Sequence, residues 1–319
     1  MKMKGVFLEE KAISRGDISL DELSELLDLT VYENTTEENK YEHISEAEVV
    51  FDNKVIMDEE LFDKCPNIKY VGVCATGYNV IDLEAARKRN ITVTNVPSYS
   101  TDSVVQLTWA FILEQVCNLE VHTKSVKSGD WTESEIFCYW LEPITELAGK
   151  TLGIIGYGNI GRKVARIAKS FGMNVIVNTA HPEKYDDDGI IFTDKDELFA
   201  TSDIITLHCP LTEDTKEIIR KENIDKMKDN VRLINVSRGG LVNEADLADA
   251  LNSGKILSAG VDVVLTEPMD KNNPLLTAKN ILITPHMAWA SVEARKRLVH
   301  EITENFKAYL DGKKRNVVN

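Results

Sequence analysis

The strongest constraint on the fold is a glycine-rich turn between an apolar strand pattern and an amphipathic helix pattern. Residues 151–155 are apolar and β-rich, and the sequence GYGNIG follows at 156–161. Apolar residues then recur at helical spacing as far as Phe171, and residues 175–177 predict a second strand. Strand, glycine turn, helix and strand together form one βαβ unit, so this part of the chain should build a parallel sheet.

The glycine turn predicts a phosphate site at the start of the helix. Backbone N–H groups at a helix N-terminus attract anions, and glycine permits both the tight turn and a close approach of the ligand. We therefore expect a dinucleotide to bind here. The contacts should come from Gly156, Gly158, Asn159, Ile160 and Gly161. The alternative is a plain βα turn in which the glycines serve only the backbone.

The end of the second strand is expected to select between NAD(H) and NADP(H). An acidic residue about 20 positions after the glycines commonly binds the adenosine ribose, but the sequence has Asn178 and Thr179 there. Asparagine can hydrogen bond a ribose hydroxyl, yet it does not repel a 2′-phosphate as a carboxylate would. No arginine follows, only His181 and Lys184. These residues favour NAD(H) and leave NADP(H) open.

Short strand patterns and longer helical patterns alternate along nearly the whole chain, which predicts α/β architecture with parallel sheets. A length of 319 residues is enough for two domains. We expect a long apolar helix over residues 102–122 that could cross between the domains. The last helix, over residues 292–310, has an apolar stripe and should fold back onto the first domain.

Domain boundaries follow from these two helices. We predict one domain from residues 1–99 plus 291–319, which would bind substrate, and a second from residues 100–290, which would bind the dinucleotide. Residues 127–147 carry several aromatic side chains without clear periodicity, so this segment is either a contact between two subunits or ordinary loop packing.

Polar side chains follow three predicted strands of the second domain. Arg238, Glu267 and His286 each come shortly after a strand pattern. The carboxyl ends of strands border the ligand crevice of an open parallel sheet, so these side chains could converge there. Each also has an ordinary alternative. Arg238 could make a surface salt bridge, His286 could be buried and bonded to backbone, and Glu267 could be a turn residue.

Several motifs in this order and approximate spacing resemble the D-isomer-specific 2-hydroxyacid dehydrogenases, from about residue 68 to residue 300. They are ATGYNVIDLEAA, GYGNIG, HCPLT, NVSRGGLVNE, AGVDVVLTEP and TPHMAW. Within the family, ATGYN, NVPSYSTDSV, GDW followed by FCYW, and HMAWAS are most similar to the glycerate dehydrogenase or hydroxypyruvate reductase branch. The resemblance implies two Rossmann-like, doubly wound parallel-sheet domains. The dinucleotide domain would be inserted in a flavodoxin-like substrate domain, and the molecule would be a homodimer.

The resemblance also implies that Arg238 binds the 2-oxo acid, that His286 donates the proton and that Glu267 is the partner of His286. The chemistry of these residue types agrees. The planar fork of arginine suits a carboxylate and the adjacent carbonyl. Hydride delivery to the carbonyl carbon leaves an oxygen that needs a proton, and histidine titrates near neutrality. A carboxylate on its other ring nitrogen favours the charged form.

Further residues are expected to line the cofactor site. They are Thr101, Asn178, His208, Cys209, Pro210, Val236, Ser237, Arg238, Asp262, His286 and Trp289. By resemblance, Asp262 meets the nicotinamide carboxamide. His208 is either structural or in contact with the cofactor.

The first domain should also contribute to substrate binding. Ala75, Thr76 and Gly77 follow an apolar strand, and backbone N–H groups in that turn could hold the substrate carboxylate. The alternative is again a plain βα turn. Cys74 is not expected to act as a nucleophile, because no activating partner is visible nearby in the sequence.

Composition excludes several other classes of protein. The formal net charge of −15 argues against nucleic acid or an anionic membrane as a partner, since both need a basic surface. The five cysteines form no CxxC pair, and the six histidines show no HxH or HExxH spacing, so no disulfide framework and no metal site are predicted. The apolar run at residues 6–8 is followed at once by Glu9 and Glu10, so it is too short for the core of a signal peptide. No apolar run reaches the roughly 18 residues that a membrane span needs. We expect a cytoplasmic protein.

Together these features predict an NAD(P)-dependent oxidoreductase that converts a small 2-oxo acid to a D-2-hydroxy acid. Hydroxypyruvate and D-glycerate are the favoured pair, with glyoxylate as a further substrate. A D-lactate-type or other D-2-hydroxyacid dehydrogenase is one alternative, and a dinucleotide-sensing, corepressor-like binding protein is another. A phosphoglycerate type is disfavoured, because no appended regulatory domain and no extra basic cluster are visible.

Overall fold

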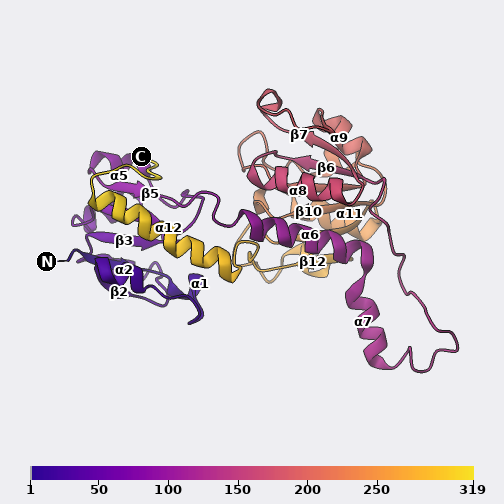
Figure 1. Ribbon diagram of the computed structural model, residues 1–319, viewed down its shortest axis with the longest axis horizontal. Coiled ribbons are helices and arrows are strands. Elements are labelled where there is room, and N and C mark those ends of the chain that lie inside the picture. The colour runs from indigo at the N-terminus through magenta and orange to yellow at the C-terminus, as the bar shows by residue number, and fades with distance from the viewer. Residues whose placement is uncertain (1) are drawn as a thin grey trace. The chain divides into compact units, whose positions relative to one another are not determined.

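The computed structural model describes residues 2–319 and divides into two compact units. The first unit comprises Met1–Ser100 and Trp289–Asn319, and the second unit comprises Thr101–Ala288. Each unit is a parallel sheet with helices on both faces (Figure 1). The predicted α/β fold class with two parallel sheets is confirmed.

The first unit contains a five-stranded parallel sheet in the order β2-β1-β3-β4-β5, which is the flavodoxin-like order. Its strands are β1 (Lys4–Phe7), β2 (Asp28–Val31), β3 (Val49–Asp52), β4 (Tyr70–Val73) and β5 (Thr92–Thr94). Its helices are α1 (Glu10–Ile13), α2 (Asp21–Leu26), α3 (Lys40–Ile44), α4 (Glu59–Lys64), α5 (Leu83–Lys88) and α12 (Val292–Leu310).

Helix α12 returns to the first unit and completes one face of its core. Its apolar stripe of Leu298, Ile302 and Phe306 is at most 1% exposed. The ring of Phe306 lies edge-on to Tyr70 of β4, with ring centroids 5.2 Å apart. The prediction that the last helix folds back onto the first domain is confirmed.

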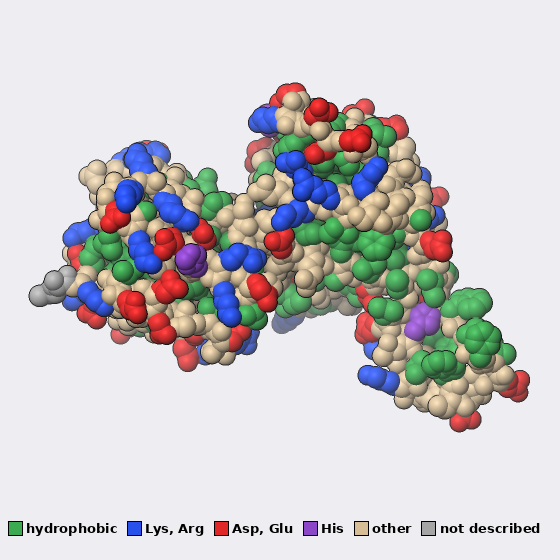
Figure 2. All heavy atoms as spheres, viewed as in Figure 1, with side chains coloured by type: hydrophobic (Ala, Val, Ile, Leu, Met, Phe, Trp, Pro, Cys, Tyr) green, Lys and Arg blue, Asp and Glu red, His purple; other side chains and the backbone are tan. Residues whose placement is uncertain are grey.

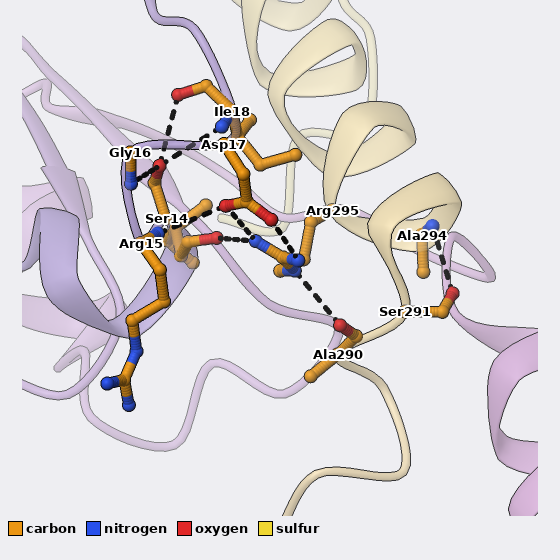
Figure 3. Close-up of polar contacts among 10 residues, drawn as sticks. Ser14, Arg15, Gly16, Asp17, Ile18, Ala290, Ser291, Ala294 and Arg295 are labelled. Atoms are coloured by element: carbon orange, nitrogen blue, oxygen red, sulfur yellow. Dashed lines mark hydrogen bonds and ion pairs between the residues drawn. The ribbon is translucent and has the colours of Figure 1, made fainter.

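An arginine near the start of α12 fixes the connection between α1 and α2. The two Nη atoms of Arg295 each lie 2.7 Å from one carboxylate oxygen of Asp17, and Nη1 also donates to the carbonyl of Ile13 (Figure 3). This bidentate pair lowers the pKa of Asp17. Arg295 Nε donates to the carbonyl of Ala290, so the same side chain also holds the segment that leads into the helix.

The second unit contains a seven-stranded parallel sheet in the order β12-β11-β10-β9-β6-β7-β8. Its strands are β6 (Thr151–Ile155), β7 (Asn174–Asn178), β8 (Ile190–Phe192), β9 (Ile204–Leu207), β10 (Val231–Asn235), β11 (Ile256–Val261) and β12 (Ile281–Ile283). Its α-helices are α6 (Thr101–Cys117), α7 (Leu119–Ser128), α8 (Asn159–Ser170), α9 (Lys195–Thr201), α10 (Lys221–Ile224) and α11 (Glu244–Ser253). Three short 3₁₀ helices are Pro182–Lys184, Gly239–Leu241 and Pro274–Thr277.

Helices cover both faces of this sheet. Helices α6 and α8 pack together on one face, and α9 and α11 lie on the other (Figure 1). The strand order reverses at β6, whose neighbours are β7 and β9. Such a switch point is where ligands bind in open α/β sheets.

The prediction of a single helix over residues 102–122 is wrong, because α6 ends at Cys117 and α7 begins at Leu119, with Asn118 between them. Asn118 has φ 54°, a left-handed conformation that asparagine tolerates better than most residues. Its side-chain amide donates to the carbonyl of Pro143, and Glu114 accepts from the N–H of Glu120. The second helix, α7, therefore leaves the sheet and begins an arm, which we define as residues 119–147.

No helix among residues 2–319 combines the length and the apolar character that a bilayer span requires.

Candidate active site

The sheet order places the three predicted catalytic side chains at one edge of the second unit. Strands β10, β11 and β12 are neighbours in a parallel sheet, so their carboxyl ends lie side by side. Arg238, Glu267 and His286 follow these three strands in turn. Residues far apart in the sequence are thereby brought to neighbouring loops.

Glu267 and His286 form a close pair. Glu267 Oε2 lies 2.6 Å from Nδ1 of His286, and both side chains are about one-third exposed, at 31% and 32%. Glu267 Oε1 accepts the backbone N–H of Val264, which limits movement of the carboxylate. Within residues 2–319, no hydrogen bond is made by Nε2 of His286. That nitrogen is the one available for proton exchange with a bound molecule.

Asp262 holds the turn that carries His286. His286 has φ 52°, and its N–H donates to the backbone carbonyl of Asp262 at 2.8 Å. The carboxylate of Asp262 accepts from the hydroxyl of Thr284 and from the N–H groups of Met287 and Ala288 at 2.5–2.8 Å. Burial raises the pKa of Asp262, and these donors oppose that effect. Both carboxylate oxygens bind groups of this turn, and the expected contact of Asp262 with the nicotinamide stays a prediction.

Arg238 is exposed and stands in a turn that Asn235 shapes. Asn235 is 1% exposed, accepts the N–H of Ser237 and donates to the carbonyl of Arg238. The next residue, Gly239, lies against the loop that carries Glu267, since a Cβ there would be 1.9 Å from the backbone carbon of Val264. This close approach packs the backbone after Arg238 against the loop that leads to Glu267, and the Arg238 side chain donates from Nη1 to the carbonyl of Ser237.

The sequence patterns did not identify two residues that support this site, Asn235 and Glu244. Glu244, at the start of α11, accepts the N–H of Leu265 at 2.7 Å and the side-chain amide of Asn273 at 2.8 Å. It thereby fixes the loop on both sides of Glu267. The motif NVSRGGLVNE contains both residues, so the signal was present, although nothing in the motif shows which backbone groups they bind.

The glycine turn has the geometry of a phosphate cradle. Gly156 has φ 96°, and a Cβ there would be 2.4 Å from the backbone nitrogen of Cys209. A Cβ on Gly161 would be 2.2 Å from the carbonyl oxygen of Gly156. A Cβ on Gly158 would project into open space directly before α8. That space, at the N–H end of the helix, fits the pyrophosphate of a dinucleotide.

His208 and Cys209 follow β9 and border this turn. The N–H of His208 donates to the carbonyl of Ile155 at 2.7 Å. Both ring nitrogens of His208 are buried and lack a partner within residues 2–319. Burial lowers the pKa of His208 to about 3 and raises that of Cys209 to about 11, so both side chains are neutral at pH 7. His208 borders the glycine turn through its backbone, and its contact with a cofactor stays a prediction.

The remaining predicted cofactor residues have several different settings. Asn178 ends β7 and donates its side-chain amide to the carbonyl of Thr193, and Ser237 Oγ donates to the carbonyl of Cys209. Thr101 begins α6. Pro210 is exposed and Val236 is buried. Trp289 belongs to the first unit and packs edge-on against Tyr99 there.

The predicted substrate turn lies after β4 in the first unit. Ala75 and Thr76 bind residues after β5: the Ala75 carbonyl accepts the N–H of Val96, and Thr76 Oγ1 donates to the carbonyl of Val96. The carbonyl of Thr76 also accepts the side chain of Asn95. Gly77 is partly exposed. Burial raises the pKa of Cys74, which argues against a reactive thiolate.

Comparison with known proteins supplies the family. Residues 109–288 match the model of the D-isomer specific 2-hydroxyacid dehydrogenase, NAD binding domain. The chain belongs to this family. It is 45% identical over 321 residues to a hydroxypyruvate reductase of Blautia hydrogenotrophica, with 99% of this chain and 100% of the relative covered. It is 39% identical to a glycerate dehydrogenase of Methylorubrum extorquens, with 100% and 99% covered.

A solved relative supports the fold over the full length. A D-lactate dehydrogenase of Aquifex aeolicus, crystallised with NAD and lactic acid, is 30% identical and superposes with a TM-score of 0.82, covering 97% of this chain and 96% of that chain. The prediction from motifs is therefore confirmed. The chain is an NAD-dependent oxidoreductase that interconverts 2-oxo and 2-hydroxy acids.

Proposed function

We propose that this enzyme reduces hydroxypyruvate to D-glycerate, and that it also accepts glyoxylate. The observation that carries the chemistry is the 2.6 Å contact between Glu267 and Nδ1 of His286, on loops that follow two strands next to the strand before Arg238. The choice of substrate is supported by the names of the relatives, hydroxypyruvate reductase and glycerate dehydrogenase. A glyoxylate reductase of Thermococcus litoralis is also 38% identical over 259 residues.

Each catalytic side chain has one task in this proposal. Arg238 binds the carboxylate of the 2-oxo acid through its guanidinium fork. Bound NADH supplies the hydride that reaches the carbonyl carbon. His286 gives a proton from Nε2 to the carbonyl oxygen as negative charge develops there. Glu267 binds Nδ1 and orients the ring so that Nε2 faces the carbonyl oxygen.

We assign the two domains different roles. Residues 100–290 bind the cofactor through Gly156, Gly158, Asn159, Ile160 and Gly161, where the first turn of α8 offers N–H groups to the pyrophosphate. Residues 1–99 and 291–319 form the substrate domain, in which the backbone N–H groups of residues 75–77 bind the substrate carboxylate. Asn178 binds the adenosine ribose, and the enzyme prefers NADH to NADPH.

The test is a comparison of 2-oxo acids with both cofactors. The loss of NADH or NADPH absorbance is followed with hydroxypyruvate, glyoxylate, pyruvate and phosphohydroxypyruvate. The proposal predicts the highest kcat/KM with NADH and hydroxypyruvate, followed by glyoxylate. A higher kcat/KM with pyruvate would make the enzyme a D-lactate type. Tight NADH binding without turnover of any of these acids would favour a corepressor-like protein.

We also propose that the enzyme is a homodimer whose subunits meet through the arm. The arm exposes large apolar side chains that nothing in its own unit covers, as Figure 2 shows below the second unit. They include Trp131, Ile136, Phe137, Trp140, Leu141 and Ile144, which are 50–87% exposed. A shallow hollow over α6 and α8 has the buried Val105 and Trp109 at its base and the 41% exposed Phe171 at its side. Exposed apolar area of this extent is typical of a protein–protein interface.

Light scattering after size-exclusion chromatography tests the dimer. The wild-type chain should elute as a dimer, and the double variant Phe137→Ser, Trp140→Ser should be largely monomeric. Ile191→Ser is the matched control, because Ile191 is 62% exposed on β8, away from the arm. A wild-type monomer, or a double variant that remains fully dimeric, would contradict this interface. We place the enzyme in the cytoplasm, in keeping with its five free cysteines.

A further inference from the structure

Two acidic side chains are buried together in the first unit, outside the residues used in catalysis. Glu9 follows β1 and is 6% exposed, and Asp52 ends β3 and is 1% exposed. Strands β1 and β3 are neighbours, so both residues lie at the carboxyl edge of the sheet. Two buried carboxylates in contact cannot both be ionised without a large cost in free energy.

Three of the four carboxyl oxygens of the pair accept a hydrogen bond from a backbone N–H. Glu9 Oε2 accepts the N–H of Asn53 at 2.8 Å, Glu9 Oε1 accepts the N–H of Lys54 at 3.1 Å, and Asp52 Oδ1 accepts the N–H of Val55 at 3.0 Å. Asp52 Oδ2 is buried and has no donor within residues 2–319. The two carboxyl groups lie near each other, because both are buried at the carboxyl ends of neighbouring strands. A proton on Asp52 Oδ2, donated to Glu9, would satisfy the fourth oxygen.

The electrostatic surroundings favour that proton. Burial raises the pKa of Asp52 well above its ordinary value, and the charge of Glu9 raises it further. The pKa of Glu9 is also raised by burial, but its two backbone donors and the hydrogen bond with Asp52 oppose the effect. Two other ionisable groups face the pair. They are Lys54, which favours the Glu9 carboxylate, and Cys74, whose buried thiol is neutral.

The pair is joined to the turn that precedes residues 75–77. The carbonyl of Asp52 accepts the N–H of Cys74 at 2.6 Å, and the N–H of Leu8 donates to the carbonyl of Phe51. These two backbone hydrogen bonds join the ends of β1, β3 and β4 directly beside the buried pair. We propose that Glu9 and Asp52 share a single proton and act as positioning residues for the substrate turn at residues 75–77. The link to substrate rests on the function proposed above for that turn, whereas the shared proton does not.

Raising the pH should weaken this cluster. When Asp52 loses its proton, two negative charges face each other in a buried site, and the hydrogen bond between them is lost. Asp52 has a higher pKa in the folded state than in the unfolded state, so the folded state binds more protons between those two values. Stability therefore falls as pH rises through that interval. The KM for the 2-oxo acid should rise over the same interval, because the turn loses its support.

Asp52→Asn is the decisive variant, because an amide can donate to Glu9 and has no proton to lose. We measure the KM for hydroxypyruvate, the KM for NADH and the thermal unfolding midpoint against pH. At low pH the variant should match the wild type within about twofold in KM, and at high pH its KM should be lower than that of the wild type. Glu9→Gln, which places an amide N–H against backbone donors, should raise the KM for hydroxypyruvate about tenfold. The KM for NADH should not change in either variant.

Glu46→Gln is the control, because Glu46 is an exposed carboxylate of the same unit, at 76%. It should follow the wild-type pH profile in every measurement. An Asp52→Asn profile identical to that of the wild type, in KM and in unfolding, would overturn the proposal. If the wild type turns over none of the acids, the proposed function fails, but the unfolding profiles still test the shared proton. An infrared titration of the wild type, with the protonated carboxyl band absent from Asp52→Asn, tests it even if Glu9→Gln does not fold.

Discussion

The role of His286 depends on which of its ring nitrogens the protein occupies. Glu267 binds Nδ1 at 2.6 Å, and the turn around residue 286 is fixed by contacts to Asp262. The histidine is thus oriented by two acidic residues that do different work. Glu267 sets the tautomer and the orientation of the ring, whereas Asp262 sets the position of the backbone.

Arg238 should tolerate lysine poorly. Arg238→Lys keeps the positive charge but loses the planar fork, so one of two parallel hydrogen bonds to the substrate carboxylate is lost. We expect kcat/KM for hydroxypyruvate to fall about 10- to 100-fold, with the KM for NADH unchanged. Steady-state kinetics checks this, and Arg220→Lys, a change at an exposed arginine, is the control. Wild-type values of both kcat and KM in Arg238→Lys would remove Arg238 from substrate binding.

Sequence reasoning at this scale could name the side chains but not all of their partners. Arg238, Glu267 and His286 follow strand ends, and parallel strands bring such residues to one edge. Most contacts of Asp262 and Asn235 are with backbone groups, and these depend on the exact path of the loops. A sequence pattern contains the residue types but not that path.

At the scale of single elements, β7 and the residue that ends it should control cofactor choice. Asn178→Asp places a carboxylate where the 2′-phosphate of NADPH would lie, so the preference for NADH over NADPH should sharpen about tenfold or more. The variant also loses the hydrogen bond to Thr193, so the ratio of the two kcat/KM values is the quantity to measure. Asn174→Asp, at the opposite end of β7, is the control. Equal changes for both cofactors would show that the ribose is bound elsewhere.

Helix α12 should contribute strongly to the stability of the first unit. Leu298 is fully buried, so Leu298→Ala should lower the free energy of unfolding by about 2–5 kcal/mol. Leu310 lies at the end of the same helix and is 48% exposed, so Leu310→Ala should change it by no more than about 0.5 kcal/mol. Urea unfolding followed by circular dichroism compares the two variants. Equal effects would contradict the assigned packing of α12.

Elements with a clear apolar period could be predicted, and elements without one could not. The limits of α12, Val292–Leu310, are those expected from its stripe. Strand β2 (Asp28–Val31) has no pattern that predicts it, because it is an edge strand with mostly exposed side chains and lacks the apolar run of a buried strand. The end of α6 before Asn118 was not predicted, because a single asparagine within an apolar helix pattern does not by itself end a helix.

At the scale of the whole molecule, strand order is what makes the site. Alternating strand and helix patterns could predict parallel sheets, but they do not give the order in which the strands pair. The observed order puts β12, β11 and β10 together on one side of the switch point and β6 and β7 on the other. The catalytic loops and the phosphate cradle therefore share one edge of one sheet. The net charge of −15 disfavours the approach of an anionic acid, and we expect Arg238 to supply the local positive charge that offsets it.

The most direct test of this account is the turnover of His286→Ala with hydroxypyruvate and NADH, measured beside its affinity for NADH. Without the proton donor, we predict that kcat falls about 100- to 10,000-fold while the Kd for NADH stays within about twofold of the wild type. His181→Ala, which removes an exposed histidine of the same unit, should behave as the wild type in both measurements. Wild-type kcat in His286→Ala would contradict the central claim that the Glu267–His286 pair delivers the proton.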